Sequence, residues 1–339
     1  MKKVTINDVA REAGVAKSTV SRVFTPGESV SEKTRVRVTE VARTLGYAPN
    51  PLARALSVSR TGIVAVVVPN IESIHISQII RGVMSVMGKN DYSIVTLDSS
   101  ENYGREARVI KPLSHQLVDG LINCYGSATE DIALISRKKP VVCIGDEPVG
   151  YKADFVAIDY LQGFGRIIGH LRDTGRKRPV LIQGKEEAST RAQGELFCQV
   201  ARDQGLTMGP EDVIYANWTP YYGYRETGKM LRRNPRPDAL VFASDFMAFG
   251  GIKALDEAGI RIPEDISVCG LDDSLISKYT VPSLTTLKFS PFHLGMKAAE
   301  LMIRRLEEQN AQPMQTILPV SLSVRKSTQP GETQEEENI

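Results

Sequence analysis

Apolar residues in the first 46 positions recur with the period of an α-helix, in three separate blocks. The first block begins at Ile6, directly after Thr5, and Thr5 and Asp8 have the spacing of a capping box at a helix N-terminus. The third begins near Ser31 and stops at Gly46, a glycine suited to the position after a helix. The sequence therefore predicts three short amphipathic helices, whose apolar stripes are Ile6, Val9, Ala10 and Ala13, then Ala16, Val20, Val23 and Phe24, and finally Val38, Val41, Ala42 and Leu45.

The first two predicted helices are joined at Gly14, where a glycine permits the backbone conformation of a tight turn. Two short helices with such a turn are typical of a helix-turn-helix unit, whose second helix enters the major groove of DNA. An arginine on that helix can donate two hydrogen bonds to a guanine edge. A small helical bundle with a solvated polar face explains the same pattern. The polar face of the second helix consists of Lys17, Ser18, Ser21 and Arg22.

Residues 47–60 contain the signals of one further helix. Asn50 is suited to the N-cap and Pro51 to the first helical position, which predicts a helix from about Pro51 to Val58. A helix of that length is too short to be stable alone in water. We therefore expect a linker that becomes helical only when other groups hold it, although a plain tether between domains fits the spacing equally well.

From Ile63 onward, short apolar runs alternate with amphipathic stretches of helical length. This alternation is typical of parallel sheets that helices cover on both faces. The runs form two series that divide near Tyr160, which predicts two α/β lobes with a cleft between them. The first series is 63–68, 93–97, 119–123, 140–144 and 155–159, and the second is 178–182, 238–242, 266–270 and 283–287.

Charge separates the same two parts of the chain. Residues 1–60 contain 11 Lys and Arg against 5 Asp and Glu, a net charge of +6, whereas the remainder contains 31 against 35, a net charge of −4. A basic block on a mildly acidic body points to a polyanionic partner for the block alone, here double-stranded DNA. Charge by itself leaves a merely solvated basic face open.

Cysteine usage and hydropathy suggest a cytoplasmic protein. The four cysteines are far apart and lie mostly in apolar runs, so we expect reduced core residues, at Cys124, Cys143, Cys198 and Cys269. The N-terminus lacks the apolar stretch of a signal peptide, and no run approaches the roughly 20 apolar residues that a membrane span requires. The polar, acidic segment 328–339 is expected to be disordered.

Several predicted strands are followed by side chains that can hydrogen-bond a polar ligand, at the edge where open α/β sheets bind ligands. Asp and Arg can bond adjacent hydroxyls, and the face of a tryptophan can pack on a sugar ring. For Asp245 a helix N-cap is the alternative role, and a lone tryptophan is also common in cores. The candidates are Asn70, Asp146, Arg191, Trp218, Ser244, Asp245, Asp272 and Asp273.

Patterns typical of enzymes are missing from this sequence. The histidines (His75, His115, His170 and His293) lack metal-ligand spacing, and no serine lies in a G-x-S-x-G turn. The run GFGRIIG at 163–169 departs from the spacing of a dinucleotide fingerprint. We therefore predict neither catalysis nor a bound cofactor or metal.

The stretches TINDVAREAGVAKSTVSRVF, LGYAPNPLARALS, SDFMAFGGIKALDEAGIRIPEDISVCGLDD and YTVPSLTTL resemble the LacI/GalR family of bacterial repressors over nearly the whole chain. The resemblance implies an all-α helix-turn-helix domain with a hinge helix, then an α/β two-lobed effector domain of the periplasmic-binding-protein type. It also implies that the chain crosses between the lobes three times. The expected domains are 1–49, the hinge 50–60, an N-subdomain of 61–160 with about 290–318, and a C-subdomain of 161–289 with about 319–327.

The resemblance further implies dimers on a pseudo-palindromic operator, with paired hinge helices in the minor groove. There Leu56, assisted by Leu52 and Ala53, would wedge into a base step and bend the duplex. Base preference stays open, because Lys17 and Ser18 occupy positions that vary within the family. The expected DNA-binding residues are Thr5, Lys17, Ser18, Thr19, Ser21, Arg22, Ser31, Thr34, Asn50, Leu52, Ala53 and Leu56.

For the effector, Arg191, Asp272 and Trp218 match ligand-contacting positions of the family. Ser244 stands where asparagine is usual, and Phe289 stands where some sugar-responsive members have a polar residue. The expected effector-binding residues are Asn70, Asp146, Arg191, Trp218, Ser244, Asp272 and Phe289.

These inferences together predict a ligand-controlled repressor of carbohydrate-utilisation genes. We expect a homodimer, since the tail lacks leucine heptads, and a sugar or sugar-like effector. Two alternatives stay open. One is a sugar-binding or carbohydrate-modifying protein with a basic arm, and the other is a DNA-binding regulator whose body docks a phosphocarrier protein.

Overall fold

The chain divides into two compact units, Met1–Gly62 and Ile63–Ile339. The computed structural model describes residues 4–24, 29–48, 60–100, 103–114, 118–126, 129–145, 147, 150–234, 236–308 and 311–329. The predicted hinge helix, with Asn50, Leu52, Ala53 and Leu56, lies outside these residues. So do Asp146 and nearly all of the predicted disordered tail.

In its described residues, 4–24, 29–48 and 60–62, the first unit contains three helices, α1 (Ile6–Ala13), α2 (Lys17–Val23) and α3 (Glu32–Leu45). Their shared core contains the fully buried Val9, Val20 and Val38. The predicted ends of α3 are confirmed, because Ser31 caps its N-terminus and Gly46 follows its last turn in the left-handed conformation. Ala16 was wrongly predicted to face the core: it is exposed, because it is the N-cap of α2 and its backbone is extended.

The described part of the second unit is built on two six-stranded sheets. The first has the order β11-β5-β4-β3-β1-β2 and is parallel throughout, and the second has the order β12-β10-β9-β8-β6-β7, with only β12 antiparallel. The first sheet contains β1 (Ile63–Val68), β2 (Ser93–Asp98), β3 (Gly120–Cys124), β4 (Val141–Ile144), β5 (Asp154–Ile158) and β11 (Gln315–Leu318). The second contains β6 (Pro179–Gln183), β7 (Val213–Tyr215), β8 (Ala239–Phe242), β9 (Ser267–Gly270), β10 (Thr285–Lys288) and β12 (Ser321–Ser323).

The nine apolar runs of the sequence all form strands, and the central strands of both sheets are buried on both faces. In β1, Val64, Val66 and Val68 belong to one core cluster, whereas Ala65 and Val67 belong to another on the opposite face. Burial on both sides explains why these strands are continuously apolar instead of alternating. The four cysteines are free and buried, as predicted.

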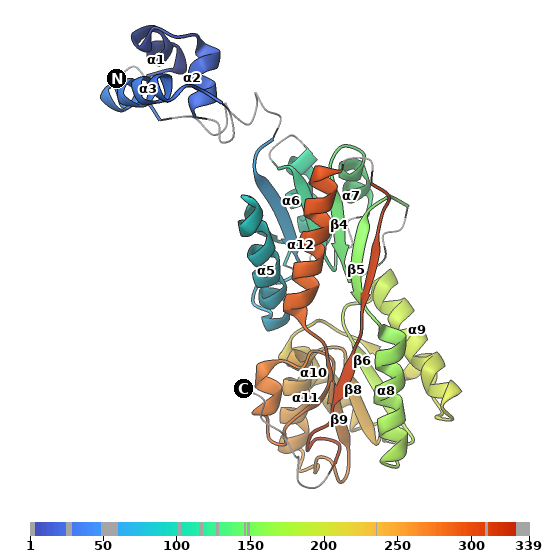
Figure 1. Cartoon of the computed structure of the whole chain (residues 1–339). Helices are drawn as coiled ribbons and strands as arrows, with labels where there is room; N and C mark the ends of the chain where they lie inside the picture. The colour runs from blue at the N-terminus through green and yellow to red at the C-terminus, as the bar shows by residue number, and fades with distance from the viewer. Residues whose placement is uncertain are drawn as a thin grey trace. The chain divides into compact units, whose positions relative to one another are not determined.

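Helices cover the two sheets as separate lobes (Figure 1). The first lobe has α5 (Ile74–Met87), α6 (Tyr103–Ile110), α7 (Thr129–Ser136) and α12 (Pro291–Glu307), and the second has α8 (Tyr160–Asp173), α9 (Ala188–Asp203), α10 (Pro220–Met230) and α11 (Asp245–Glu257). Short 3₁₀ turns are η1 (Gly88–Asn90), η2 (Lys111–Ser114), η3 (Pro210–Asp212) and η4 (Leu275–Lys278). The chain passes between the lobes after β5, after β10, and from β11 to β12.

Two helix pairs approach each other through glycines. A Cβ atom on Gly295 of α12 would lie 2.0 Å from the carbonyl oxygen of Ile79 in α5, and one on Gly82 would lie 2.0 Å from that of Phe292. Gly223 of α10 similarly faces the backbone of Met247 in α11. These helices therefore contact backbone to backbone, which only glycine permits.

No helix among those described is long and apolar enough to cross a membrane. The run GFGRIIG lies inside α8 (Tyr160–Asp173).

Candidate functional site

The outward face of α2 is polar and exposed. Lys17, Ser18, Ser21 and Arg22 are exposed and Thr19 is half-buried, because Val20 and Val23 direct the opposite face into the core. Arg35 of α3 donates a hydrogen bond to the carbonyl oxygen of Val23, 3.2 Å away, and so ties the end of α2 to α3.

The other predicted DNA contacts of this unit lie at helix N-termini. Thr5 is exposed, and both its backbone N–H and its hydroxyl donate to Asp8, at 3.0 and 2.7 Å. These bonds hold the pKa of Asp8 below its ordinary value. The hydroxyls of Ser31 and Thr34 lie 2.8 Å apart at the start of α3. The N-terminus of a helix favours a negatively charged partner such as a phosphate.

In the second unit, a cavity of about 160 Å³ lies where the carboxyl ends of both sheets meet. Its wall includes residues that follow strands of the first sheet, such as Asn70 after β1 and Tyr125 after β3. It also includes residues that follow strands of the second sheet, such as Trp218, Ser244 and Phe289. This is the position that open α/β sheets offer a ligand.

Five of the predicted effector residues line the cavity: Asn70, Trp218, Ser244, Asp272 and Phe289. Arg191 does not. Its side chain is 58% exposed and lies 3.8 Å from Glu186, so the structure does not bring it together with the other five, and its ligand contact stays a prediction. Asp146 lies outside the described residues.

Sequence reasoning missed much of the wall. Aromatic side chains contribute a large share of it, and Lys185 and Glu187 add a base and an acid whose closest charged atoms are 3.9 Å apart. Burial raises the pKa of Glu187. Their position in the sequence could have indicated them, since these residues follow a strand or occupy the first turns of the next helix. The missed aromatic residues are His75, Tyr125, Tyr160, Phe246 and Phe249.

Trp218 is fixed against the backbone of Gly184, directly after β6. A Cβ atom at position 184 would lie 2.0 Å from the indole ring, so only glycine allows this contact. The ring therefore packs directly on the backbone at this part of the cavity wall.

The N-terminal ends of three helices border the cavity. Their N-cap residues Ser73 of α5, Glu187 of α9 and Ser244 of α11 all line it. Helix N-termini carry partial positive charge, which favours oxygen-rich or anionic ligand groups.

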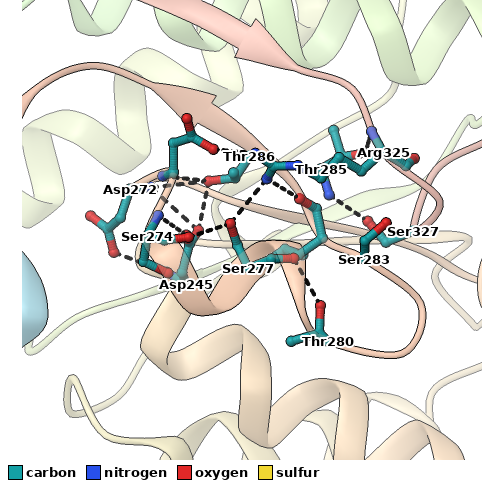
Figure 2. Close-up of polar contacts among 12 residues, drawn as sticks. Asp245, Asp272, Ser274, Ser277, Thr280, Ser283, Thr285, Thr286, Arg325 and Ser327 are labelled. Carbon is teal, nitrogen blue, oxygen red and sulfur yellow. Dashed lines mark hydrogen bonds and ion pairs between the residues drawn. The ribbon is translucent and has the colours of Figure 1, made fainter. Parts of the chain in front are cut away.

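Beneath this wall, Asp245 and Asp272 form a buried polar pair with Thr286 of β10 (Figure 2). Asp245 accepts hydrogen bonds from the hydroxyl of Thr286 (2.6 Å) and the backbone N–H groups of Ser274 (2.8 Å) and Asp272 (3.3 Å). The N–H of Asp245 donates to Asp272 in return, at 2.9 Å. Asp245 is thus not the N-cap that the sequence suggested: Ser244 caps α11 by accepting from the N–H of Met247.

Arg325, after β12, holds the loop that carries Asp272. Its buried guanidinium donates to Asp273 (2.5 Å), to the hydroxyl of Ser277 (3.0 Å) and to the carbonyl of Leu284 (2.8 Å). Figure 2 shows Arg325 and Ser277 next to the pair of Asp245 and Asp272. The position of Asp272 therefore depends on a segment about 50 residues away in the sequence.

Burial shifts the pKa values of the acidic pair and of His75, and in each case it favours the neutral form. It raises the pKa of Asp272 to about 7, and burial together with the charge of Asp272 raises the pKa of Asp245 to about 7. Burial also lowers the pKa of His75, across the cavity, to about 4. Among the described residues, no group of three or more His, Cys, Asp or Glu side chains could hold a metal ion.

Two parts of the chain match models of known protein families. Residues 5–50 match the model of bacterial regulatory proteins of the lacI family, and residues 168–328 match a periplasmic binding protein-like domain. The HTH-type transcriptional repressor PurR of Pasteurella multocida is 30% identical over 329 residues, 95% of this chain and 98% of that protein. The chain belongs to the lacI family of bacterial regulatory proteins. It is a DNA-binding regulator of transcription, as its resemblance predicted.

Further relatives and solved structures extend the likeness. Catabolite control protein A of Priestia megaterium is 28% identical over 96% of this chain and 99% of its own length. A lac repressor dimer bound to operator and the anti-inducer ONPF has a TM-score of 0.82 at 27% identity, covering 96% of this chain and 99% of that one. The transcriptional regulator CelR in complex with cellobiose has a TM-score of 0.73 at 26% identity, covering 96% and 100%. These likenesses confirm the predicted fold class, and these relatives are regulators, not enzymes.

Proposed function

We propose that this lacI-family regulator is a repressor of carbohydrate-utilisation genes that binds a pseudo-palindromic operator as a homodimer. Its operator affinity would be set by a sugar or sugar-like effector in the cavity. The observation that carries the proposal is the cavity itself, whose wall combines aromatic rings, hydrogen-bonding groups and three helix N-termini. A ligand shifts the population between two arrangements of the lobes only as far as it binds one arrangement more tightly than the other.

For DNA, we assign base contacts to the exposed face of α2 and phosphate contacts to helix N-termini. Arg22 suits a guanine edge, and Lys17 and Ser18 can contact bases or phosphates. Thr5, Thr19, Ser21, Ser31 and Thr34 complete this set. The hinge residues Asn50, Leu52, Ala53 and Leu56 are assigned by family resemblance, with Leu56 as the wedge in the minor groove.

For the effector, we assign Asn70, Trp218, Ser244, Asp272 and Phe289, with Asp146 and Arg191 by resemblance. The face of Trp218 suits the apolar side of a sugar ring, and Asp272 suits adjacent hydroxyls. CelR, a relative of similar fold, was solved with cellobiose. The aromatic wall also supports a second class, a flat heteroaromatic ligand such as a purine, which would stack between the rings.

The proposed homodimer is supported by an exposed apolar surface on the second lobe. It consists of Leu275, Ile276, Tyr279 and Val281, and we call it the 275–281 patch. Tyr279 is 75% exposed and Val281 is 88% exposed. Neighbouring exposed apolar side chains of this kind mark interaction sites on soluble proteins.

The test is an operator-binding titration. An operator selected from random duplexes would be labelled, and anisotropy at fixed salt would follow its binding to the full chain, since phosphate contacts make affinity salt-dependent. The probes would be cellobiose, glucose, ribose, hypoxanthine and adenosine. We expect one sugar to change operator affinity, and Trp218→Leu to abolish that response while leaving binding without a probe intact.

A response to hypoxanthine or adenosine alone would favour the purine class. Indifference to a broad panel of small molecules would instead favour the alternative of a phosphocarrier protein as partner. A pulldown from extract, with and without a purified phosphocarrier protein, would then decide. If no discrete palindrome is selected at all, the repressor proposal is wrong.

A further inference from the structure

His75 is the residue of the first lobe that faces the carboxyl group of Asp272 in the second. It lies in the first turn of α5, and its Nε2 atom is 2.9 Å from the hydroxyl oxygen of Tyr125, which follows β3. Its Nδ1 atom is 3.3 Å from Oδ1 of Asp272, which follows β9. Both the imidazole and the carboxyl side chain are only 13% exposed.

The His75 ring is held in place by other aromatic rings. Its centroid is 5.6 Å from that of Tyr125 and 5.6 Å from that of Phe289, which approaches edge to face. These rings limit the rotation of the imidazole, so Nε2 stays directed at Tyr125 and Nδ1 at Asp272. Among the described residues, Nδ1 makes no hydrogen bond of good geometry, so its contact with Asp272 is close but not yet aligned.

This contact is between groups that do not both carry charge at neutral pH. Burial keeps the imidazole neutral, since it lowers the pKa of His75 to about 4. Lys185 and Glu187 line the same cavity, and Asp245 lies behind Asp272. Burial raises the pKa of both carboxyl groups, and two negative charges so close disfavour each other, so the pair holds a proton up to neutral pH.

Hydrogen bonding indicates which carboxyl group takes that proton. Asp245 accepts three hydrogen bonds, from Thr286, Ser274 and Asp272. Asp272 accepts one, from the N–H of Asp245. Donors stabilise the charged form, so Asp245 keeps its charge and the proton resides on Asp272.

We propose that His75 changes tautomer as Asp272 gains or loses its proton, and thereby keeps a polar contact between the two lobes in both states. When Asp272 is protonated, its O–H donates to Nδ1 of His75, and the Nε2–H donates to the oxygen of Tyr125. When Asp272 is ionised, Nδ1–H donates to the carboxylate, and Nε2 accepts from the Tyr125 hydroxyl. One proton in total leaves to water, and the imidazole carries a single proton throughout.

The inference goes beyond the proposed function, and rests on it only for its consequence. If Asp272 contacts the effector, an effector group would enter between His75 and Asp272. It would replace a hydrogen bond in which Asp272 is the donor at low pH and the acceptor at high pH. A hydroxyl, which both donates and accepts, can match either state. His75 is then a positioning residue that acts through Asp272.

The test is ring-nitrogen NMR on the full chain labelled with ¹⁵N-histidine, without DNA or effector, from about pH 5 to about pH 9. We expect the His75 signals to exchange character: Nε2 protonated at low pH and Nδ1 protonated at high pH, with a midpoint near 7, the pKa of Asp272. His75→Gln assigns the signals. His170, a second partly buried histidine, contacts Thr328 and serves as an internal control, whose neutral form should keep one tautomer.

A second variant separates the switch from a structural role. Asp272→Asn cannot ionise, so His75 should keep one tautomer over the whole range while His170 is unchanged. A single tautomer in the wild-type protein, or protonation of both His75 nitrogens near pH 7, would overturn the inference. So would a tautomer exchange that persists in Asp272→Asn. None of these measurements depends on an effector, so the result is independent of the proposed function.

Discussion

At the scale of single residues, the cavity floor places two carboxyl groups where water has little access. Asp245 is 1% exposed, and the Asp272 side chain is 13% exposed. Each is retained by hydrogen bonds to backbone N–H groups, and neither faces a lysine or arginine among its described contacts. A pair held in this way favours a proton over a second negative charge.

The first prediction concerns stability against pH. Burial raises the pKa of Asp272 from 3.8 to about 7, so the folded protein binds more protons than the unfolded chain between these values. Its contribution to the free energy of unfolding therefore falls as pH rises from about 4 to about 7. Asp272→Asn removes this loss, and should be more stable than wild type above pH 7, by about 1–3 kcal/mol.

Chemical denaturation at several pH values would measure the difference. His75 acts in the opposite sense, because the unfolded imidazole is protonated below about pH 6.5 and the folded one only below about 4. The informative quantity at each pH is therefore the free energy of unfolding of Asp272→Asn minus that of the wild type, since the contribution of His75 is common to both. Asp173→Asn, an exposed carboxylate on α8, is the control. Equal slopes for all three proteins would contradict the assignment.

The second prediction uses the only tryptophan of the chain. Gly184→Ala would place a Cβ atom 2.0 Å from the Trp218 ring, so the ring must move. We expect a red shift in fluorescence emission as the indole becomes more hydrated, and a loss of about 1–3 kcal/mol in stability. Gly228→Ala in α10, where no atom lies within 4 Å of the new Cβ, should leave the emission unchanged.

The third prediction concerns Arg22. Replacing Arg22 by alanine should relax preference at one base position, by about 1–3 kcal/mol if the contact to guanine is bidentate. Binding to single-substituted operators at one salt concentration measures this. Arg43→Ala, an exposed arginine in the last turn of α3, should leave base preference unaltered. If Arg22→Ala and the wild type showed the same base preference, Arg22 would not be one of the residues that contact bases.

At the scale of elements, glycines set the distance between helices that cover the sheets. Gly82 and Gly295 bring α5 and α12 into backbone contact, and Gly223 does the same for α10 against α11. The first turn of α5 carries His75, and α11 begins beside Ser244. The spacing of these helix pairs thus positions residues on both sides of the cavity.

The fourth prediction is that Gly295→Ala destabilises the protein by about 1–3 kcal/mol, because its Cβ would meet the carbonyl oxygen of Ile79 and neither backbone can yield alone. Urea denaturation measures the loss. Gly165→Ala in α8 is the matched control, since its Cβ would lie 3.7 Å from the nearest atom. That change should be neutral or stabilising, because alanine favours a helix. A neutral Gly295→Ala would show that the helices separate at little cost.

The strands that the sequence failed to predict share one property. β7, β11 and β12 all lie at sheet edges, are partly exposed and have only three or four residues, so each gives a weak apolar signal. The fourth edge strand, β2, has six residues and was predicted. The central strands were predicted because burial imposes that run. Likewise, Asp272 could be predicted because it follows a predicted strand, whereas Trp218 follows the unpredicted β7 and was assigned by family resemblance. His75 could not be predicted, because its contact is with a residue about 200 positions away.

At the scale of the whole molecule, the 275–281 patch lies directly after the cavity wall. Ser274 lines the cavity and donates to Asp245, and the next residue, Leu275, is already exposed. One short turn therefore separates the ligand site from the surface that we assign to the dimer.

The fifth prediction is that Tyr279→Glu weakens the homodimer at least tenfold, because it places a charge in the apolar patch. Sedimentation velocity over a range of concentrations would measure dissociation. Leu161→Glu, at an exposed leucine of α8, introduces the same charge outside the patch and should leave the dimer intact. A dimer equally stable in both variants would place the interface elsewhere.

The last passage between the lobes has a consequence for biosynthesis. β11, at Gln315–Leu318, pairs with β5 and forms one edge of a sheet whose other strands end by Ile158. A growing chain must therefore be synthesised past Leu318 before that sheet gains its final strand. Nascent chains truncated before residue 315 should leave the β5 edge unpaired, and so should be especially prone to bind chaperones.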